Sequence, residues 1–147
     1  MLGWREWVAL PELGIHAVHA KVDTGARTSS LQAFDVMPYD GDQHRRIRFR
    51  VLPHEDDVDG ALQCDAELVE ERWIKDSGGH ATLRPVIRTL LHIGGEHFPI
   101  ELSLATRPDL AFRMLLGRGA LRGRFVVDPW ASHMAGTGVT ADFGVSD

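Results

Sequence analysis

The sequence predicts an all-β protein built as a small closed barrel or sandwich. Short strand-like runs separated by turn residues follow one another along most of the chain, and hardly any segment has a helical pattern. Residues 46–51 give the clearest signal, because apolar side chains alternate strictly with arginines there. The chain has 147 residues, which is enough for one domain with a substantial core.

Three hairpins, the strand at 46–51, one last strand and a short helix are expected along the chain. The hairpins pair residues 4–10 with 15–22, run from Leu68 to Leu83 around a tip at 76–79, and pair 86–93 with 98–104. The last strand is expected at 125–127, the helix at 119–121 and an acidic loop at 53–59. We expect one domain over residues 1–131, followed by a loose tail over 132–147 that is rich in small residues.

Composition and charge limit the partners and the location. The net charge of −5 argues against general nucleic-acid binding. The sequence shows no membrane-spanning apolar run and no signal-peptide pattern. The lone Cys64 cannot form an internal disulfide, which fits a reducing compartment. We therefore expect a cytoplasmic protein.

An acid turn, Asp23-Thr24-Gly25-Ala26, directly follows the strand-like run 15–22 and occurs once. The run delivers Asp23 to a tight turn, in which Gly25 permits backbone conformations that a Cβ would forbid. A carboxylate held at a strand end in this way is placed to bind and activate water. Such a turn can also simply link two strands.

A second motif, Leu115-Leu116-Gly117-Arg118, lies late in the chain, before the expected helix. An acid turn early and this motif late resemble the retropepsin-type aspartic proteases. In those enzymes Asp-Thr-Gly begins the active-site turn, and the late motif lies on a strand that crosses behind it. The ordered pair is a much stronger signal than either motif alone.

The whole chain narrows this resemblance to one bacterial family. Four segments carry it, at residues 3–13, 20–31, 84–87 and 114–118. They resemble the retropepsin-like family often labelled "ATP-dependent zinc protease", which is associated with RimK, the ligase that adds glutamate tails to a ribosomal protein. The resemblance implies a retropepsin-like barrel with a flap hairpin and a short C-terminal helix. The sequence itself has neither a Gly-Lys-Ser/Thr phosphate loop nor a His-Glu-x-x-His helix.

The resemblance implies an aspartic peptidase, and the count of acid turns implies a homodimer. Such an enzyme uses two carboxylates that share one proton, one as general base and one polarising the scissile carbonyl. This chain brings one such acid, so we expect Asp23 and its mate to meet on a two-fold axis. By resemblance, Thr24 hydrogen-bonds across the interface, the backbone near Gly25 holds the carboxylate, and Arg118 braces the dimer or the turn.

Residues 70–82 are expected to form the flap that covers the substrate. Ser77, Gly78 and Gly79 would provide a mobile tip whose amides can meet a peptide main chain. An ordinary surface hairpin explains these residues equally well. The position of the segment, between the acid turn and the late motif, favours the flap.

Arginines suggest an acidic substrate, because arginine binds carboxylates in bidentate fashion. The candidates are Arg46, Arg48 and Arg50 on one strand face, Arg27 after the acid turn, and Arg84 and Arg88 after the flap. We expect Arg27 and Arg84 to contact an acidic peptide or a glutamate-tailed protein. Exposed arginines without a ligand are the alternative interpretation.

No metal or other cofactor is expected. Histidines and the pair Cys64-Asp65 supply potential ligands, yet His16 and His19 fall on opposite faces of a regular strand. No Cys-x-x-Cys and no helical histidine pair accompanies them. His80, beside the expected flap tip, is the histidine most worth testing, with a surface position as its default.

Two features depart from a minimal retropepsin. Lys21 lies two residues before Asp23, where it would either lower the pKa of the acid or extend into solvent. Extra length at residues 35–60 would either shape substrate access or form an inert loop.

Two other functions stay open. A non-catalytic peptide-binding or dimerisation module could use the same fold, and a metal-dependent peptidase would not need Asp23. Retention of both Asp23 and Thr24 favours the aspartic enzyme, because a buried carboxylate pair costs stability.

Overall fold

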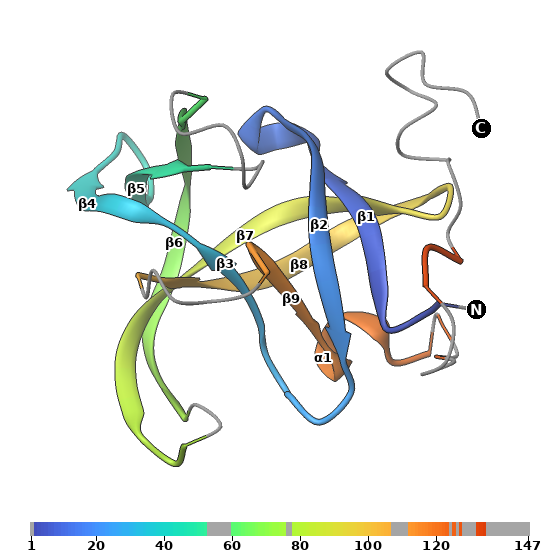
Figure 1. Cartoon of the computed structure of the whole chain (residues 1–147). Coiled ribbons are helices and arrows are strands. Elements are labelled where there is room, and N and C mark those ends of the chain that lie inside the picture. Colours follow the sequence, from blue (N-terminus) through green and yellow to red (C-terminus); the bar gives the residue numbers. More distant parts are fainter. Residues whose placement is uncertain are drawn as a thin grey trace.

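The protein folds into a closed barrel with a sheet extension. The computed structural model describes residues 2–52, 60–75, 78–106, 112–123, 125, 127 and 132–134. Within these residues one sheet has the strand order β1-β2-β9-β3-β8-β7-β6-β5-β4, and β1 also pairs with β7. That pairing closes β1, β2, β9, β3, β8 and β7 into a six-stranded barrel (Figure 1). The prediction of an all-β closed barrel is confirmed.

Strands account for most of the described residues. They are β1 (Arg5–Leu10), β2 (Ile15–Asp23), β3 (Ser29–Gln32), β4 (Phe34–Asp40), β5 (Arg45–Val51), β6 (Leu62–Lys75), β7 (Ala81–Ile93), β8 (Glu96–Ala105) and β9 (Met114–Gly117). A 3-10 turn, η1 (Pro11–Leu13), joins β1 to β2, and the short helix α1 (Arg118–Leu121) follows β9 close to its predicted position. No helix in the described parts of the chain is long and apolar enough to cross a membrane.

The first and third predicted hairpins are confirmed, and the second is larger than predicted. β1 pairs with β2, and β7 pairs with β8, both antiparallel. β7 runs unbroken from Ala81 to Ile93, so it serves two hairpins where the sequence suggested separate strands. Pro85 fits inside this strand because the pairing of β7 with β8 begins only at Val86. At an unpaired strand edge, the missing N–H of proline costs no ladder hydrogen bond.

The segment at 35–60, expected as an insertion, is partly regular structure. Residues 34–40 form β4, which pairs antiparallel with β5 and is the last strand in the sheet order. The strand pattern was hidden because Pro38 interrupts it, and proline is tolerated on an edge strand. β3 was also missed, since Ser-Ser-Leu-Gln is short and polar. The expected acidic loop, 53–59, lies outside the described residues.

The core lies inside the barrel and under its extension. On β5, Ile47, Phe49 and Val51 are buried while the arginines between them reach toward the surface, as the alternation predicts. Barrel strands contribute further fully buried side chains, among them Leu102 of β8 and Met114 of β9.

The two ends of the described chain meet at β1. Glu6 is fully buried, and its Oε2 accepts hydrogen bonds from Gly3 N (2.7 Å) and Met134 N (2.6 Å). His133 N donates to Arg5 O at 2.8 Å. Of the expected last strand, Phe125 and Val127 are described, and Val127 forms an isolated bridge with Leu2. Residues 135–147 of the expected tail lie outside the described residues.

The burial of Leu102 makes it a test of the barrel core. Leu102 is 0% exposed on β8, between β7 and β3. Leu102→Ala should lower the free energy of unfolding by about 2–5 kcal/mol, because it leaves a cavity. Met37→Ala, at a side chain that is 62% exposed, should change it by less than about 0.5 kcal/mol. Urea unfolding of both variants measures the difference, and equal losses would contradict this core.

Candidate active site

The acid turn begins where β2 ends, at Asp23. Gly25 N donates to Asp23 Oδ1 at 2.9 Å, and Ala26 N donates to Asp23 O at 3.2 Å. The first bond fixes the direction of the carboxylate, and the second closes the turn. Asp23 is half-buried, whereas Thr24 and Gly25 are exposed. The acid therefore stands on a rigid support with its surroundings open to a ligand.

β9 passes directly behind this turn. It lies between β2 and β3, and Gly117 is in register with Asp23. Gly117 N donates to Ser29 Oγ at 3.0 Å. A Cβ on Gly117 would lie 2.7 Å from the carbonyl carbon of Thr28 and 2.9 Å from Ala26 O. Only glycine fits here without a backbone shift, which explains why the late motif contains one.

The start of α1 holds the acid turn from the same side. Arg118 N donates to Ala26 O at 2.8 Å, and Gly119 N donates to Arg27 O at 3.1 Å. The Arg118 side chain adds a hydrogen bond from Nη1 to Gly25 O at 3.1 Å. Main chain and side chain of the late motif thus both bind the turn, a contact of the kind that the resemblance implies for Arg118.

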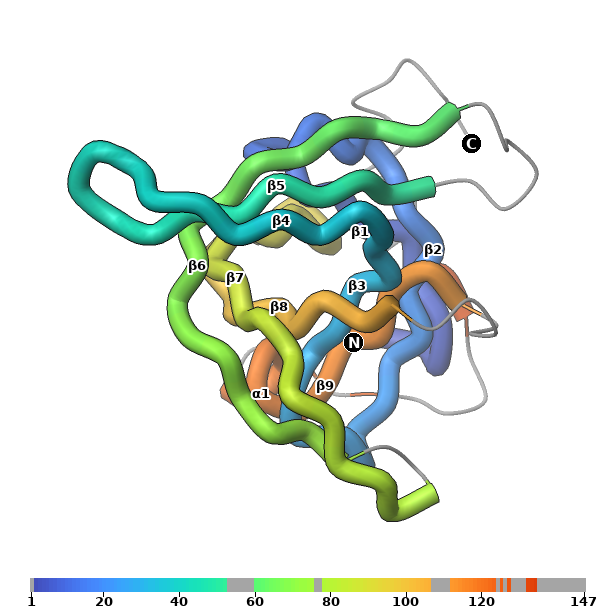
Figure 2. Tube along the Cα trace, turned by 90° about the vertical axis from the view of Figure 1, so that its left-hand side faces the viewer, coloured from blue at the N-terminus to red at the C-terminus, as the bar shows by residue number. Residues whose placement is uncertain are grey.

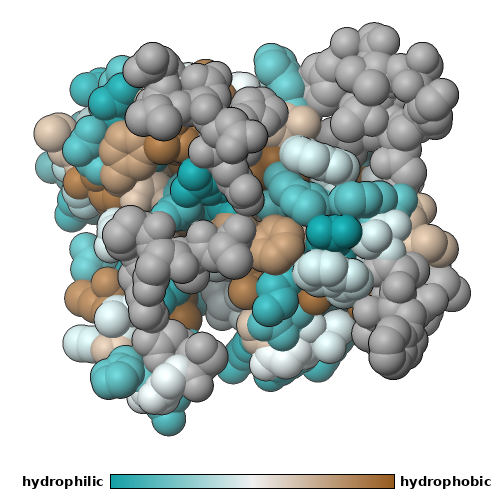
Figure 3. Space-filling model, in the orientation of Figure 1, coloured by the Kyte–Doolittle hydropathy of each residue, from teal (hydrophilic) through white to brown (hydrophobic). Residues whose placement is uncertain are grey.

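A cleft of about 1060 Å³ lies between the acid turn and the distal half of the β6–β7 hairpin. We call residues 70–75 and 78–84 of that hairpin the β6–β7 arm. Figures 1 and 2 both show the arm reaching the end of the barrel where β2 turns into β3, and the surface is hollowed beside the arm in Figure 3. The cleft is lined by residues 25–29, 72–75, 98–101 and 118–120.

The predicted substrate contacts fall in different places. Arg27 lines the cleft and is exposed. Gly78 and Gly79 are exposed in the arm, where Gly79 has a left-handed φ of 83°, and Ser77 lies outside the described residues. Arg84 is opposite Arg72 in the arm, and its Nε donates to Thr82 Oγ1 at 2.9 Å. Arg84 is not among the residues that line the cleft.

The three arginines of β5 lie away from the cleft and are paired within the chain. Arg46 Nε is 2.7 Å and Arg48 Nε 3.5 Å from the Asp65 carboxylate, and Arg50 contacts Asp35. Burial opposes ionisation of Asp65, but hydrogen bonds from Tyr39 and Arg46 outweigh it and lower the pKa of this carboxyl. These arginines therefore join β4, β5 and β6 rather than reach toward the acid turn.

Sequence reasoning missed the charged residues of the cleft wall, Arg72, Lys75 and Glu101. Arg72 could have been found from the hairpin itself. A hairpin tip centred on residue 78 places Arg72 opposite Arg84, the residue that the sequence predicts as a substrate contact. Glu101 has no comparable signal, because only the pairing of β7 with β8 brings it to this wall.

In the described part of the chain, the residues considered as metal ligands do not gather into one site. No cluster of three or more His, Cys, Asp or Glu side chains that could hold a metal ion occurs among the described residues. His16 and His80 are exposed. His19 instead stacks on Trp7 at 4.6 Å, with its Nε2 3.0 Å from His133 Nε2. Lys21, two residues before the acid, is exposed.

A family model described as RimB-like, "Retropepsin-like aspartic endopeptidase RimB", matches residues 1–137. The chain belongs to this family. The match covers both the acid turn and the late motif, so the retropepsin part of the sequence interpretation is confirmed. The expression "ATP-dependent zinc protease" does not occur in the description of the family or in those of the relatives below.

Curated relatives carry a different name. A "Probable alpha-L-glutamate ligase" of Parasynechococcus marenigrum is 43% identical over 92% of this chain and 29% of its own length. One of Shewanella pealeana with the same name is 37% identical over 92% of this chain and 30% of its own length. The chain therefore spans less than a third of the length of these relatives.

A solved structure shares the fold. The crystal structure of Lpg0085 from Legionella pneumophila, described as of unknown function, aligns with a TM-score of 0.76 at 23% identity. The alignment covers 91% of this chain and 96% of the other.

The close contact between Gly117 and the backbone of the acid-turn loop predicts that an added methyl group at this position lowers stability. Gly117→Ala should lower the free energy of unfolding by about 1–3 kcal/mol, because the new Cβ overlaps the backbone of Thr28 and Ala26. Urea unfolding measures the loss. An unchanged stability would contradict the close approach of β9 to the turn.

Cys64 should be unreactive in the folded protein. Its thiol is buried, its Sγ lies 3.4 Å from Leu13 O, and burial raises its pKa to about 11. Since the thiolate is the reactive form, a thiol-specific reagent at pH 8 should label the native protein far more slowly than the urea-unfolded one. Because the chain has one cysteine, the signal reports on Cys64 alone. Equal rates in both states would contradict this environment.

Proposed function

We propose that this chain is one half of a homodimeric aspartic peptidase, with Asp23 from each copy forming the catalytic pair. The observation that carries the proposal is the braced acid turn. Its carboxylate is oriented by Gly25 N, its backbone is held by the main chain and side chain of Arg118, and its residues Gly25 and Ala26 line a large cleft. Membership of a family described as retropepsin-like aspartic endopeptidases supports the same chemistry.

The chemistry follows from pairing two such acids. Close together, two carboxylates cannot both be ionised, so they share one proton. The ionised acid takes a proton from a bound water, whose oxygen attacks the scissile carbonyl carbon while the protonated acid donates to the carbonyl oxygen. The hydrogen bond from Gly25 N uses one acceptor site of Asp23 Oδ1, so the carboxylate keeps further acceptor sites on both oxygens for the water and the second acid. A single copy would lack half of this machinery.

We further propose that the substrate is an acidic peptide, with the glutamate tail of a protein as the best candidate. Among the described residues that line the cleft, the cations Arg27, Arg72, Lys75 and Arg118 stand against one carboxylate, Glu101. The relatives named as glutamate ligases supply a second argument. Less than a third of each matches this chain, so the ligase name can describe the remainder. A peptidase joined to a ligase of glutamate would act on the polymer that the ligase makes.

Asp23→Asn tests the mechanism on a protein with a poly-glutamate tail, between pH 4 and 8. The variant should lose about 10²–10⁴-fold in kcat/KM, because amide side chains cannot share and transfer the proton. A chelator should leave the wild type unaffected. Asp40→Asn, at an exposed acid on β4 outside the cleft lining, is the matched control and should retain full activity.

Two outcomes would contradict the proposal. Activity that survives Asp23→Asn and disappears with chelator would indicate a metal-dependent peptidase. Binding of the tailed protein without any cleavage by the wild type would indicate a peptide-binding module. The dimer is tested separately, by adding excess Asp23→Asn protein to limiting wild type. Mixed dimers carry one acid and should reduce the activity, whereas an active monomer would not respond.

A further inference from the structure

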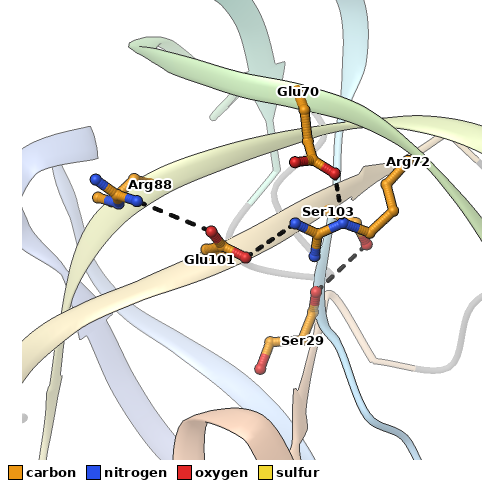
Figure 4. A network of polar contacts seen from close by, with 6 residues as sticks. All are labelled: Ser29, Glu70, Arg72, Arg88, Glu101 and Ser103. Carbon is orange, nitrogen blue, oxygen red and sulfur yellow. Dashed lines mark hydrogen bonds and ion pairs between the residues drawn. The ribbon is translucent and has the colours of Figure 1, made fainter.

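Arg72, on the β6–β7 arm, lines the cleft and binds the carboxylates of Glu70 and Glu101 (Figure 4). Its Nε donates to Glu70 Oε1 at 2.9 Å, and its Nη2 donates to Glu101 Oε1 at 3.1 Å. Arg88 Nη2 lies 3.9 Å from the other oxygen of Glu101. The guanidinium is thus held by two carboxylates of its own chain, one on the arm and one on the barrel strand β8.

Arg72 and Glu101 lie beside β3, the strand that leaves the acid turn. Glu101 and Ser103 share a face of β8, and Ser103 Oγ donates to Ser29 O at 3.3 Å (Figure 4). Ser29 begins β3, and its Oγ accepts the hydrogen bond from Gly117 N behind the acid turn. Arg72 and Glu101 both line the cleft. A peptide bound against the acid turn would therefore run next to them.

The Arg72 guanidinium has N–H donors left to bind another carboxylate. Its two hydrogen bonds to described residues use two of its five N–H donors. The side chains of Arg72 and Glu101 are 33% and 39% exposed, and ion pairs at this degree of exposure are weak. A ligand carboxylate can consequently replace Glu101 at small cost.

We infer that Arg72 is the receptor for a glutamate side chain of the substrate, and that Glu101 occupies this receptor in the free protein as a substitute carboxylate. The inference rests on the proposed preference for acidic peptides and names the residue that enforces it. A structural brace is the competing explanation of the same contacts. The two explanations predict opposite effects of removing the charge of Glu101. If Glu101 competes with the ligand, its removal strengthens the binding of an acidic ligand. If Glu101 braces the cleft wall, its removal weakens the binding of any ligand.

Binding of labelled decaglutamate and decaglutamine tests this difference. Both are measured by fluorescence anisotropy on the Asp23→Asn protein at about 0.05 M salt, where cleavage does not interfere. In that protein, the additional substitution Glu101→Gln should raise the affinity for decaglutamate about three- to tenfold. Arg72→Gln should lower this affinity about tenfold, as expected for one partly exposed charge pair. Neither should change the affinity for decaglutamine by more than about twofold.

Matched controls come from the ion pair Arg45–Asp40, which joins β4 to β5 outside the cleft lining. Arg45→Gln and Asp40→Asn make the same charge changes and should each leave both affinities within about twofold. Thermal unfolding of every variant confirms that it is folded.

Four results would overturn the inference. They are weaker or unchanged decaglutamate binding in Glu101→Gln, equal losses for both peptides in Arg72→Gln, equal effects in the control pair, and no decaglutamate binding at all. The peptidase proposal fails independently, through the cleavage assay. Suppose that Asp23→Asn leaves cleavage intact while Glu101→Gln and Arg72→Gln change the affinity for decaglutamate as expected. In that case the cleft binds acidic peptides, but the aspartic mechanism is wrong.

Discussion

The backbone of β9 passes so close to the acid turn that no side chain fits between them, and the geometry of the cleft depends on this contact. Gly117 supplies the missing volume, and its N–H binds Ser29, the first residue after the loop. Arg118 then holds Gly25 O from beyond the strand. Because a parallel ladder fixes Gly117 beside Asp23, the position of the carboxylate is set by the barrel and not by a flexible loop. Preorganisation of this kind is what a reacting carboxylate requires.

The sequence allowed the barrel and the acid turn to be predicted because both depend on short-range patterns. Alternation along β5 and paired glycines between β7 and β8 indicate strands and turns directly, and the late motif carries a steric requirement at Gly117. The special backbone conformation expected of Gly25 was wrong, because its φ lies outside the left-handed region. Edge and polar strands were missed, since Pro38 and the serines of β3 do not follow the rules for central strands.

The charged wall of the cleft was harder to predict than the acid turn. The regular spacing of the arginines of β5 suggests a surface for an acidic substrate, yet Asp65 pairs with two of them, Arg46 and Arg48. The partner of an exposed arginine is decided by strands far away in the sequence. Arg72 and Glu101 are separated by 29 residues and meet only because β7 lies between their strands. Pairing between strands, and not local pattern, therefore determines which charges face a ligand.

The continuity of β7 has a mechanical consequence for the arm beside the cleft. The same strand forms one side of the arm and one wall of the barrel, so the arm cannot rotate as a separate body about a loop. Any bending must be concentrated where the ladder is weakest, at the irregular pairing between Leu68 and Glu70 and opposite Pro85. Motion of the arm is then elastic deformation of a single sheet, and its restoring force comes from the packed barrel itself.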